Sequence, residues 1–483
     1  MGRRALLIAG CLAFGASACS AGAPVSVGPA PSTAESTTES TPETTATSAE
    51  AAELDAKGLL AQVRPSIGLI TTPISQGSGV LIEGGYIVTN AHVVDPHSTA
   101  TITFEGDDPI TGVPVVGIDP YADIMVLGPI ETDRPPLPIA SEMQLEQGDP
   151  VYLIGYPGEF EVTPEVTLSS GLVSRLRNYA PFDHTYVQTD AAIGGGQSGG
   201  ALLDSRGQVV GISGLSVAEE FALALSGPDV LRSVDAIDSG GTPPFRPLIT
   251  EPAETSGSFS FPDDTYYNLL LLNAADVDRD LRLTVPDQSQ PLIEIRDLVG
   301  DLAFANQRMI DTAIAGDPSL TAADIGVPLT SLGPNEYSAA IPAGVDAMIT
   351  LATARPEGAE VSYVSSLPLV EYPYEQDVKS IEPGDSVEGV LDAFELDDLY
   401  LLDLEAGQTV TIRVSAGAGD PVFTVYPPGV DSSTVTPVDD SGIGLNGLDA
   451  EETFTAEVAG TYEVFVSMAD RFVTGYRLDV EPG

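Results

Sequence analysis

Residues 194–200 read Gly194-Gly195-Gly196-Gln197-Ser198-Gly199-Gly200, with strand patterns on both sides, at Tyr186–Thr189 and Gly200–Leu203. A serine hydroxyl attacks a carbonyl only when it projects from a tight turn, and the attacked oxygen must meet backbone N–H groups. Glycine permits both the turn and the close approach. A flexible linker is the alternative interpretation, but strands that follow so closely are wrong for a linker. We therefore predict that Ser198 is a nucleophile and that the N–H groups of Gly196 and Ser198 form its oxyanion hole.

A histidine directly follows an apolar strand pattern, in Ile87-Val88-Thr89-Asn90-Ala91-His92-Val93-Val94. An imidazole with a pKa near neutrality can accept the serine proton and return it to the leaving amine. The other histidines, His97 and His184, stand in polar, turn-like contexts and are predicted to be solvated loop residues. A lone histidine beside a strand is more often structural than catalytic, so the role of His92 depends on the other motifs.

A carboxylate stands at the start of another apolar pattern, in Asp119-Pro120-Tyr121-Ala122-Asp123-Ile124-Met125-Val126-Leu127. Such a carboxylate is costly unless it accepts hydrogen bonds, and an imidazole N–H is the partner that a catalytic triad offers. Asp119 is the competitor, but it begins a proline turn and is predicted to be solvated. The sequence thus predicts a triad of His92, Asp123 and Ser198.

Short apolar strand patterns follow one another from Leu59 to about Ser239, and hairpin turns are predicted at Glu83–Gly85 and Asp204–Gly207. About eleven short strands in this length fit two small antiparallel barrels. The predicted strands are Ser66–Ile70, Gly79–Ile82, Tyr86–Thr89, Thr101–Phe104, Val113–Ile118, Asp123–Leu127, Pro150–Gly155, Val166–Val173, Tyr186–Thr189, Gly200–Leu203 and Gln208–Ile212.

The segment Gly240–Pro244 marks a boundary, and beyond it the sequence repeats itself weakly. Asp263-Asp264-Thr265-Tyr266 and Asp397-Asp398-Leu399-Tyr400 each precede apolar runs that occur in the same order. We predict two β-sandwich modules of common descent, a degenerate one at about 250–368 and a second at 370–483. The fold class is therefore all-β.

Acidic residues dominate the composition, with 71 Asp and Glu against 19 Lys and Arg and a net charge of −52. A polyanion such as nucleic acid is repelled by this charge, so a nucleic-acid partner is excluded. Acid pairs such as Asp397-Asp398 and Asp439-Asp440 lack the dense spacing of a Ca²⁺ loop and are predicted to be solvated surface acids. No metal site is predicted.

The N-terminus has the pattern of an export signal, because Arg3 and Arg4 precede an apolar stretch, Ala5–Ala18, that is too short to span a bilayer. The signal ends Ala16-Ser17-Ala18-Cys19, which resembles the lipobox of bacterial lipoproteins, so Cys19 is predicted to carry a lipid anchor in the cell membrane. Ordinary secretion is the alternative. Residues 19–56 are rich in Ala, Ser, Thr, Pro and Glu and are predicted to be a disordered tether.

The three chemical motifs together resemble the trypsin-like serine peptidases, and among them the HtrA and Deg branch. The resemblance rests on Thr89–Val94, Ala122–Leu127, Val187–Ile193 and Gly196–Gly200, and it covers about 57–240. Two departures are visible: Gly194-Gly195 replaces the usual Asn-Pro, and Gln197 stands where Asn or Asp is usual. No PDZ-like domain follows, so the cage assemblies of some relatives are not carried over and the oligomeric state stays open.

This resemblance implies the chymotrypsin fold of two barrels and endopeptidase activity on protein or peptide substrates, with no cofactor and an acyl-enzyme on Ser198. It also implies a specificity pocket bounded by Ile193 and by Ala222, Leu223 and Ala224, in a segment without charge. A buried cationic side chain finds no counter-charge there. A small or aliphatic residue is therefore expected before the cut.

The second C-terminal module resembles the bacterial pre-peptidase C-terminal domain. The resemblance rests on the Asp-Asp-x-Tyr start, on Gly407–Ile412 and on the ending Gly460-Thr461-Tyr462 through Gly475–Leu478. The first module lacks the Gly-Gln-Thr turn and has Ala274–Asp278 in its place. Neither module contains a chemistry-bearing cluster.

Three functions are compatible with these features. The first is an exported endopeptidase of the cell envelope. The second is a catalytically silent envelope protein that binds or adheres through its C-terminal sandwiches, although a relic usually loses at least one triad residue. The third is an enzyme that trims its own C-terminal modules, which follows from the pre-peptidase resemblance.

Overall fold

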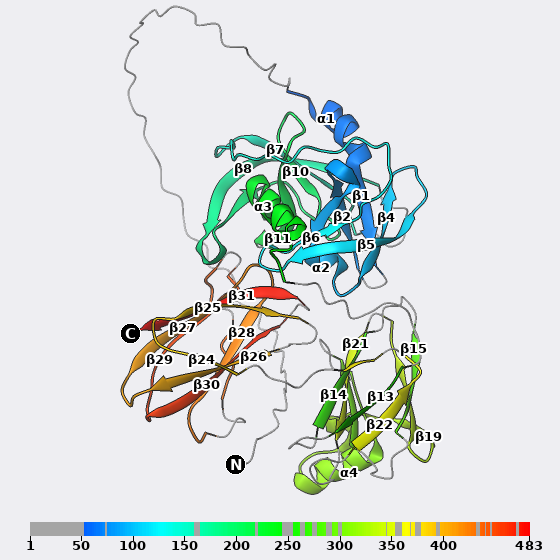
Figure 1. Cartoon of the computed structure of the whole chain (residues 1–483), viewed down its shortest axis with the longest axis vertical. Helices are drawn as coiled ribbons and strands as arrows, with labels where there is room; N and C mark the ends of the chain where they lie inside the picture. The colour runs from blue at the N-terminus through cyan, green and yellow to red at the C-terminus, as the bar shows by residue number, and fades with distance from the viewer. Residues whose placement is uncertain are drawn as a thin grey trace, which may run out of the picture. The chain divides into compact units, whose positions relative to one another are not determined.

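The structure is a computed structural model (Figure 1). It describes residues 53–72, 75–158, 165–217, 221–243, 255–260, 266–272, 278–285, 292–297, 302–343, 345–352, 360–367, 369–371, 378–392, 397–430, 435–439, 441–444, 447–469 and 473–483. The predicted signal, Cys19 and the predicted tether up to residue 52 lie outside the described residues. No helix in these described ranges has the length and apolar character needed to cross a membrane.

The first barrel is closed and antiparallel, with the strand order β1-β2-β3-β6-β5-β4. Buried and less buried side chains alternate along β4, and Ile102 and Phe104 join Ile70 inside the barrel. Its strands are β1 (Ile67–Thr71), β2 (Gln76–Leu81), β3 (Ile87–Asn90), β4 (Thr99–Phe104), β5 (Ile110–Asp119) and β6 (Ile124–Leu127), and the one-turn helix α2 (Ala91–Val94) follows β3.

The second barrel is likewise closed and antiparallel, with the order β10-β11-β12-β9-β8-β7 and an interior that includes Val151, Val187 and Leu202. Its strands are β7 (Pro150–Gly155), β8 (Thr167–Tyr179), β9 (His184–Thr189), β10 (Ala201–Leu203), β11 (Val209–Val217) and β12 (Phe221–Ser226). Two six-stranded barrels confirm the predicted all-β class and the double-barrel architecture.

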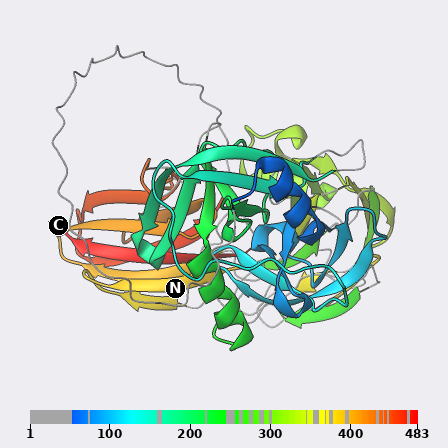
Figure 2. The same ribbon diagram turned by 90° about the horizontal axis from the view of Figure 1, so that it is seen from above.

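A shared apolar cluster joins the two barrels, because Val80 and Val88 of the first pack with Ile154, Leu203 and Leu223 of the second. Helix α3 (Gly227–Asp238) contacts β5 and β6 of the first barrel as well as β11 and β12 of the second (Figures 1 and 2). It begins at the N-cap Ser226, whose side chain accepts the Asp229 N–H. Helix α1 (Ala56–Val63) also buries side chains in the shared cluster.

The sequence patterns missed β12, and the reason lies in its composition. Residues 221–225 are apolar at every position, so they lack the alternation that identifies a half-buried strand. The structure pairs β12 with β9 and β11 and buries Ala222 through Ser226. Strands β5 and β8 are also longer than predicted, since both extend through exposed positions that carry no apolar signal.

The next unit packs two sheets around one apolar core that includes Leu283, Ile293 and Leu351. One sheet has the order β13-β22-β15-β20-β19 and the other β18-β17-β16-β21-β14-β23. The elements are β13 (Thr255–Ser260), β14 (Tyr266–Leu272), β15 (Arg279–Thr284), β16 (Leu292–Asp297), β17 (Ala303–Ala305), α4 (Gln307–Gly316), α5 (Ala322–Ile325), β18 (Val327–Pro328), β19 (Thr330–Gly333), β20 (Glu336–Ile341), β21 (Asp346–Ala352), β22 (Glu360–Ser365) and β23 (Val370–Glu371).

The last unit also packs two sheets around a core, which includes Tyr400, Val410, Phe423 and Tyr476. The sheets have the orders β24-β26-β30-β28 and β25-β31-β27-β29. The strands are β24 (Val378–Ile381), β25 (Ser386–Leu391), β26 (Asp397–Leu404), β27 (Thr409–Ala416), β28 (Pro421–Tyr426), β29 (Ala450–Thr455), β30 (Gly460–Met468) and β31 (Thr474–Pro482).

The two units share their central strand order, which agrees with the internal repeat read from the sequence. The order β16-β21-β14 in the first corresponds to β28-β30-β26 in the second. In the facing sheets, β13-β22-β15-β20 corresponds to β25-β31-β27-β29. The strands that the repeat aligned, β14 with β26 and β16 with β28, thus occupy equivalent places in the two sandwiches.

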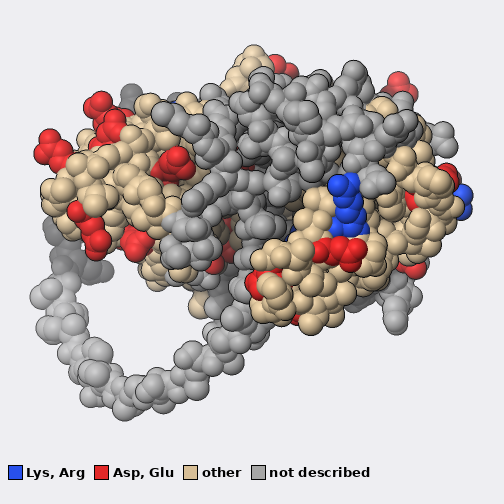
Figure 3. Space-filling view, turned by 90° about the horizontal axis from the view of Figure 1, so that it is seen from below, with Lys and Arg blue, Asp and Glu red and all other residues tan. Residues whose placement is uncertain are grey.

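Acidic side chains are spread over the molecule. On the face drawn in Figure 3, the described Asp and Glu residues lie on several separate parts of the surface. This distribution is consistent with a surface that repels polyanions as a whole.

One acidic residue departs from the prediction of a solvated surface acid. Asp398 is 5% exposed; it accepts a hydrogen bond from the Tyr476 hydroxyl and one from the Lys379 ammonium group at 3.0 Å. The Tyr476 hydroxyl also lies 2.6 Å from that of Tyr400. Burial raises the pKa of Tyr476, with Asp398 as a second cause, so the phenol stays protonated and donates. The prediction was wrong for Asp398, because its neighbours in the fold supply partners that the sequence pattern does not reveal.

Replacement of Asp398 by Ala removes the buried acceptor of two donors and is expected to destabilise the protein by about 3 kcal/mol. Urea unfolding of the full chain measures this change. The matched control is Glu463→Ala on the neighbouring strand β30, an exposed position that is expected to change stability by less than about 0.5 kcal/mol. Equal stabilities of the two variants would contradict the structural role of Asp398.

Candidate active site

His92 and Asp123 face each other in the first barrel. The Nδ1 atom of His92 lies 2.7 Å from Oδ2 of Asp123, and the backbone N–H of His92 donates to Oδ1 of the same carboxylate at 3.0 Å. Asp123 is 5% exposed, whereas the His92 side chain is 27% exposed. An Nδ1–H that donates to the carboxylate leaves Nε2 without a proton and free to accept one.

The backbone at Asp123 is unusual, with a φ of 54° in the left-handed region. A residue other than glycine keeps this conformation only when its surroundings enforce it. Here the Asp123 carbonyl accepts hydrogen bonds from the Ala91 N–H and from the Asn90 side-chain amide, both at 3.0 Å. These bonds bind the aspartate to the strand end that carries the histidine.

Ser198 reaches the same place from the second barrel. Its carbonyl accepts the Ser78 N–H at 2.8 Å, and the next residue, Gly199, donates its N–H to the Asn90 side-chain oxygen at 2.6 Å. Asn90 thus binds Asp123 through one side-chain atom and the serine turn through the other. Within the described residues no hydrogen bond joins the side chains of His92 and Ser198, and such catalytic contacts often tighten only when substrate binds.

The glycine turn leaves two backbone N–H groups without hydrogen-bond partners among the described residues. The Gly195 carbonyl accepts the Gly158 N–H at 2.5 Å, and the N–H of a trans peptide points away from its carbonyl, so the Gly196 N–H is directed away from Gly158. Gly196 has a φ of 83°, and a Cβ there would lie 2.5 Å from the Gly158 nitrogen. In the described part of the chain neither the Gly196 nor the Ser198 N–H has a partner.

Gln197 supports this turn from inside. It is 5% exposed; its side-chain oxygen accepts the Gly194 N–H at 2.7 Å, and its amide donates to the Thr167 hydroxyl at 3.0 Å. The long side chain therefore bridges the turn to β8. Gln197, which departs from the Asn or Asp usual in the HtrA and Deg branch, therefore has a defined structural role.

The two other histidines are buried, not solvated as predicted. His97 and His184 are each 5% exposed. Burial lowers the pKa of His97 to about 4 and also lowers the pKa of His184, so both rings are neutral at neutral pH. Apolar packing of the surrounding chain, and for His184 ring contacts with Phe182 and Tyr186, override the polar local sequence. His92 is therefore the exposed histidine among the three.

Asp119 is also more constrained than predicted. One of its carboxylate oxygens accepts the Tyr121 N–H at 3.1 Å, and the other accepts the Ser233 hydroxyl of α3 at 2.7 Å. It shapes the loop that leads to Asp123 and holds it against α3. The helix was not predicted from the sequence, so this partner was missed.

The residues predicted to form a specificity pocket separate into two groups. Ile193 packs against the cluster inside the second barrel that contains Ala222 and Ala224. Leu223 lies on the opposite face of β12 and belongs to the cluster between the barrels. Successive side chains of a strand point to opposite faces, so Leu223 cannot line the same wall as its neighbours.

Sequence reasoning missed the residues that join the two halves of the site. Asn90 stands inside a motif quoted from the sequence, but nothing local shows that its side chain reaches both Asp123 and Gly199. Ser78 donates its hydroxyl to the Gly196 carbonyl at 2.9 Å and accepts the Tyr156 N–H at 2.8 Å. The only sequence signal for Ser78 was its place as a small residue between Gly77 and Gly79.

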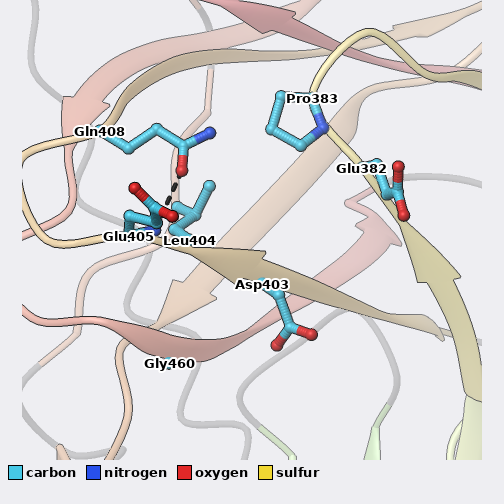
Figure 4. A pocket seen from close by; sticks show the side chains of 7 residues that line it. All are labelled: Glu382, Pro383, Asp403, Leu404, Glu405, Gln408 and Gly460. Carbon is cyan, nitrogen blue, oxygen red and sulfur yellow. Dashed lines mark hydrogen bonds between the residues drawn. The ribbon is translucent and has the colours of Figure 1, made fainter.

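A separate shallow pocket lies in the last unit and is drawn in Figure 4. Its lining residues are Glu382, Pro383, Asp403, Leu404, Glu405, Gln408 and Gly460. Gln408 accepts the Glu405 N–H at 2.9 Å, which closes the Gly-Gln-Thr turn on itself. The described residues contain no group of three or more His, Cys, Asp or Glu side chains that could hold a metal ion.

Comparison with known proteins identifies the double barrel. Residues 77–212 match the family model of the trypsin-like peptidase domain. This part of the chain is similar to trypsin-like peptidase domains. Its similarity to serine proteases of the HtrA group confirms the resemblance drawn from the triad motifs.

The similar proteins include mitochondrial serine protease HTRA2 of Bos taurus, 35% identical over 162 residues, which are 32% of this chain and 34% of that protein. A probable periplasmic serine endoprotease DegP-like protein of Halomonas elongata is 32% identical over 220 residues, 43% of this chain and 44% of its own. The crystal structure of a serine endoprotease from Yersinia pestis aligns with a TM-score of 0.35 and 25% identity, covering 40% of this chain and 69% of that one. The chain thus spans less than half the length of these two curated relatives.

A carboxyl group beside the peptidase site has a strongly shifted pKa. Burial, together with the nearby carboxylates of Asp392 and Asp123, raises the pKa of Asp95 to about 8. Asp95 is thus protonated in the folded protein at neutral pH but ionised in the unfolded chain above about pH 4. The unfolded state then binds fewer protons, so this group makes stability fall as pH rises from about 4 to 8.

Asp95→Asn is expected to remove this contribution, so the melting temperature of the full chain should change less between pH 5 and pH 8 than in the wild type. Thermal unfolding at several pH values provides the measurement. Glu131→Gln, at an exposed position in the same domain, serves as the control and should retain the wild-type pH dependence. An Asp95→Asn protein with the full wild-type dependence would show that another group is responsible.

Proposed function

We propose that the protein is an extracytoplasmic serine endopeptidase that hydrolyses peptide bonds through His92, Asp123 and Ser198. The observation that carries the proposal is the bridge made by Asn90, which binds the backbone of Asp123 on one side and the turn of Ser198 on the other. This bridge brings a partly exposed histidine with a carboxylate on Nδ1 beside a serine on a glycine turn. The similar proteins, which are named serine proteases and endoproteases, also support it.

In the first step the Ser198 Oγ attacks the scissile carbonyl carbon while Nε2 of His92 removes its proton. The imidazole becomes an imidazolium, and the Asp123 carboxylate 2.7 Å from Nδ1 stabilises that charge and keeps the ring in orientation. His92 then gives the proton to the leaving amine. The C–N bond breaks, and an acyl-enzyme remains on Ser198.

In the second step water replaces the amine. His92 removes a proton from the water, the hydroxide attacks the acyl carbon, and the proton returns to Ser198 as the carboxylic acid leaves. Both tetrahedral intermediates carry an oxyanion. We assign its binding to the N–H groups of Gly196 and Ser198, and removal of one such donor from comparable sites costs about 3–4 kcal/mol in the barrier.

We place the enzyme outside the cytoplasm, with its lipid anchor on Cys19 and its substrates among exported proteins or peptides. The apolar segment that ends in Ala16-Ser17-Ala18-Cys19 supports the anchor. Similar proteins from Chlamydia trachomatis, Chlamydia muridarum and Halomonas elongata have the word periplasmic in their names, which supports the location. The chain requires no cofactor for this chemistry.

The triad is tested by fluorophosphonate labelling of the full chain. Wild-type protein should be labelled on one serine, Ser198→Ala should lose the label, and His92→Ala and Asp123→Ala should label on the order of 10³–10⁴-fold more slowly. Ser239→Ala, at an exposed serine of the same domain, is the matched control and should label at the wild-type rate.

The labelling rates are interpreted together with the unfolding temperature of each variant. All variants should unfold at similar temperatures, so a lost label reports chemistry. A correctly folded wild type that takes no label would reject the peptidase and favour a catalytically silent protein that binds through its C-terminal sandwiches.

We infer the substrate preference from Ile193, which is half-buried and packs against the uncharged barrel cluster that contains Ala222 and Ala224. Peptides with Ala, Val or Leu before the cut should be hydrolysed at least about tenfold faster, in kcat/KM, than matched peptides with Arg or Lys. A panel of otherwise identical fluorogenic peptides measures the ratios. Fastest cleavage after Arg or Lys would contradict this pocket.

A further inference from the structure

The loop that carries Asp123 is also held from outside the peptidase domain. Residues 53–483 form one compact unit, and the loop between β5 and β6 contacts the last sandwich within it. The Gly475 N–H at the start of β31 donates to the buried Pro120 carbonyl at 3.0 Å. Pro120 lies three residues before Asp123, so the bond fixes the backbone that leads into the strained aspartate.

Two buried glycines of the sandwich allow this close approach. The Gly417 N–H donates to the Gly475 carbonyl at 3.3 Å, so the two residues lie side by side. A Cβ on Gly417 would lie 1.7 Å from the Tyr121 carbonyl oxygen, and a Cβ on Gly475 would lie 2.2 Å from Cδ1 of the Tyr121 ring. At both positions the three nearest atoms all belong to Tyr121. Neither position has a positive φ, so space beside Tyr121 is what requires glycine there.

Further hydrogen bonds surround the contact between Tyr121 and the two glycines. The Tyr179 hydroxyl at the end of β8 donates to the Asp449 carboxylate, at 2.8 and 2.9 Å from its two oxygens, and the Tyr186 hydroxyl donates to the Gly417 carbonyl at 3.3 Å. Tyr179, Tyr186 and Asp449 are all at most 5% exposed. Buried hydrogen bonds to a carboxylate are among the stronger polar contacts in proteins. The contact is therefore built from paired polar groups, not from loose apposition.

The contact also reaches both sides of the loop. Phe182 packs its ring against Tyr121 on the loop and against Tyr179, with centroid distances of 5.5 and 5.7 Å. Arg477 of β31 donates to the Pro181 carbonyl at 3.0 Å, and Val473 packs against the first-barrel cluster that includes Ala91 beside His92. The sandwich thus touches the elements that flank His92 and Asp123.

We propose that the C-terminal sandwich is a positioning element of the peptidase site, which acts through Gly417, Gly475 and Tyr121 to hold Asp123 against His92. The inference rests on the proposed function for its effect on activity. In structural terms, the Asp119–Asp123 loop keeps its conformation only while the sandwich is docked. Displacement of the sandwich then moves Asp123 and weakens its support of the imidazolium.

The test uses the full chain with Gly417→Ala and Gly475→Ala, which place a methyl group against Tyr121. Both variants are expected to label with fluorophosphonate at least tenfold more slowly. The pH midpoint of labelling should also shift downward, because an imidazole with weaker carboxylate support holds its proton less firmly. A merely structural effect would reduce the folded fraction without moving the midpoint. Gly316→Ala, at a glycine with no atom within 4 Å of the added methyl group, is the matched control and should label as the wild type does.

Hydrogen–deuterium exchange of the same proteins gives a readout that does not depend on activity. Faster exchange in residues 119–127 of both glycine variants is the expected result. If Gly417→Ala fails to fold, Tyr179→Phe provides a milder variant, which removes one donor from the contact and keeps the ring.

The outcomes separate the two claims. A labelled wild type whose glycine variants label at the same rate and pH midpoint would overturn the positioning role and leave the peptidase intact. A wild type that takes no label would reject the proposed function; the positioning of the loop would then be judged by exchange alone, supported by faster exchange in residues 119–127 and overturned by unchanged exchange.

Discussion

The peptidase site depends on a few hydrogen bonds between the two barrels, at the point where β2 and β3 meet the glycine turn. Ser78 binds both the Ser198 carbonyl and the Gly196 carbonyl, and Asn90 binds the Gly199 N–H. The proposed nucleophile belongs to one barrel and its proposed base to the other, so neither barrel has the site alone. The apolar cluster between the barrels also joins them, but the burial of apolar surface has no directional preference. These few polar contacts set the relative position of the reacting groups.

The sequence predicted the double barrel and the resemblance to trypsin-like serine peptidases better than the contacts that surround the proposed site. The proposed triad residues stand in short motifs because catalysis restricts residue type and local backbone within a few positions, as in the glycine turn around Ser198. Burial of His97, His184 and Asp398 was not predictable from their polar local sequences, and the partners of Asp398, Lys379 and Tyr476, are distant from it in the chain. Strand β12 was missed because it is apolar at nearly every position, and helix α3 because only Val230 and Ile237 among its buried residues carry an apolar side chain.

The two C-terminal units show how a repeated fold can take on unequal roles. They share the central strand order, yet only the second presents the paired glycines Gly417 and Gly475 beside Tyr121. The difference lies at the strand ends, where β27 stops and β31 begins, and not in the cores. Repeat detection from sequence responds to the cores, so it identified the likeness of the units and gave no indication of this contact.

The contact between the sandwich and the peptidase domain also changes the meaning of a break in the chain. The two contacting parts are separated in sequence by the whole unit from β13 to β23, residues 255–371, so the covalent chain and the docking contact together form a closed ring. A single cut in the linking segments opens the ring but removes neither half of the contact. The halves of a nicked molecule then stay together according to their mutual affinity, as two subunits would, and processing of the chain is distinct from loss of its C-terminal part.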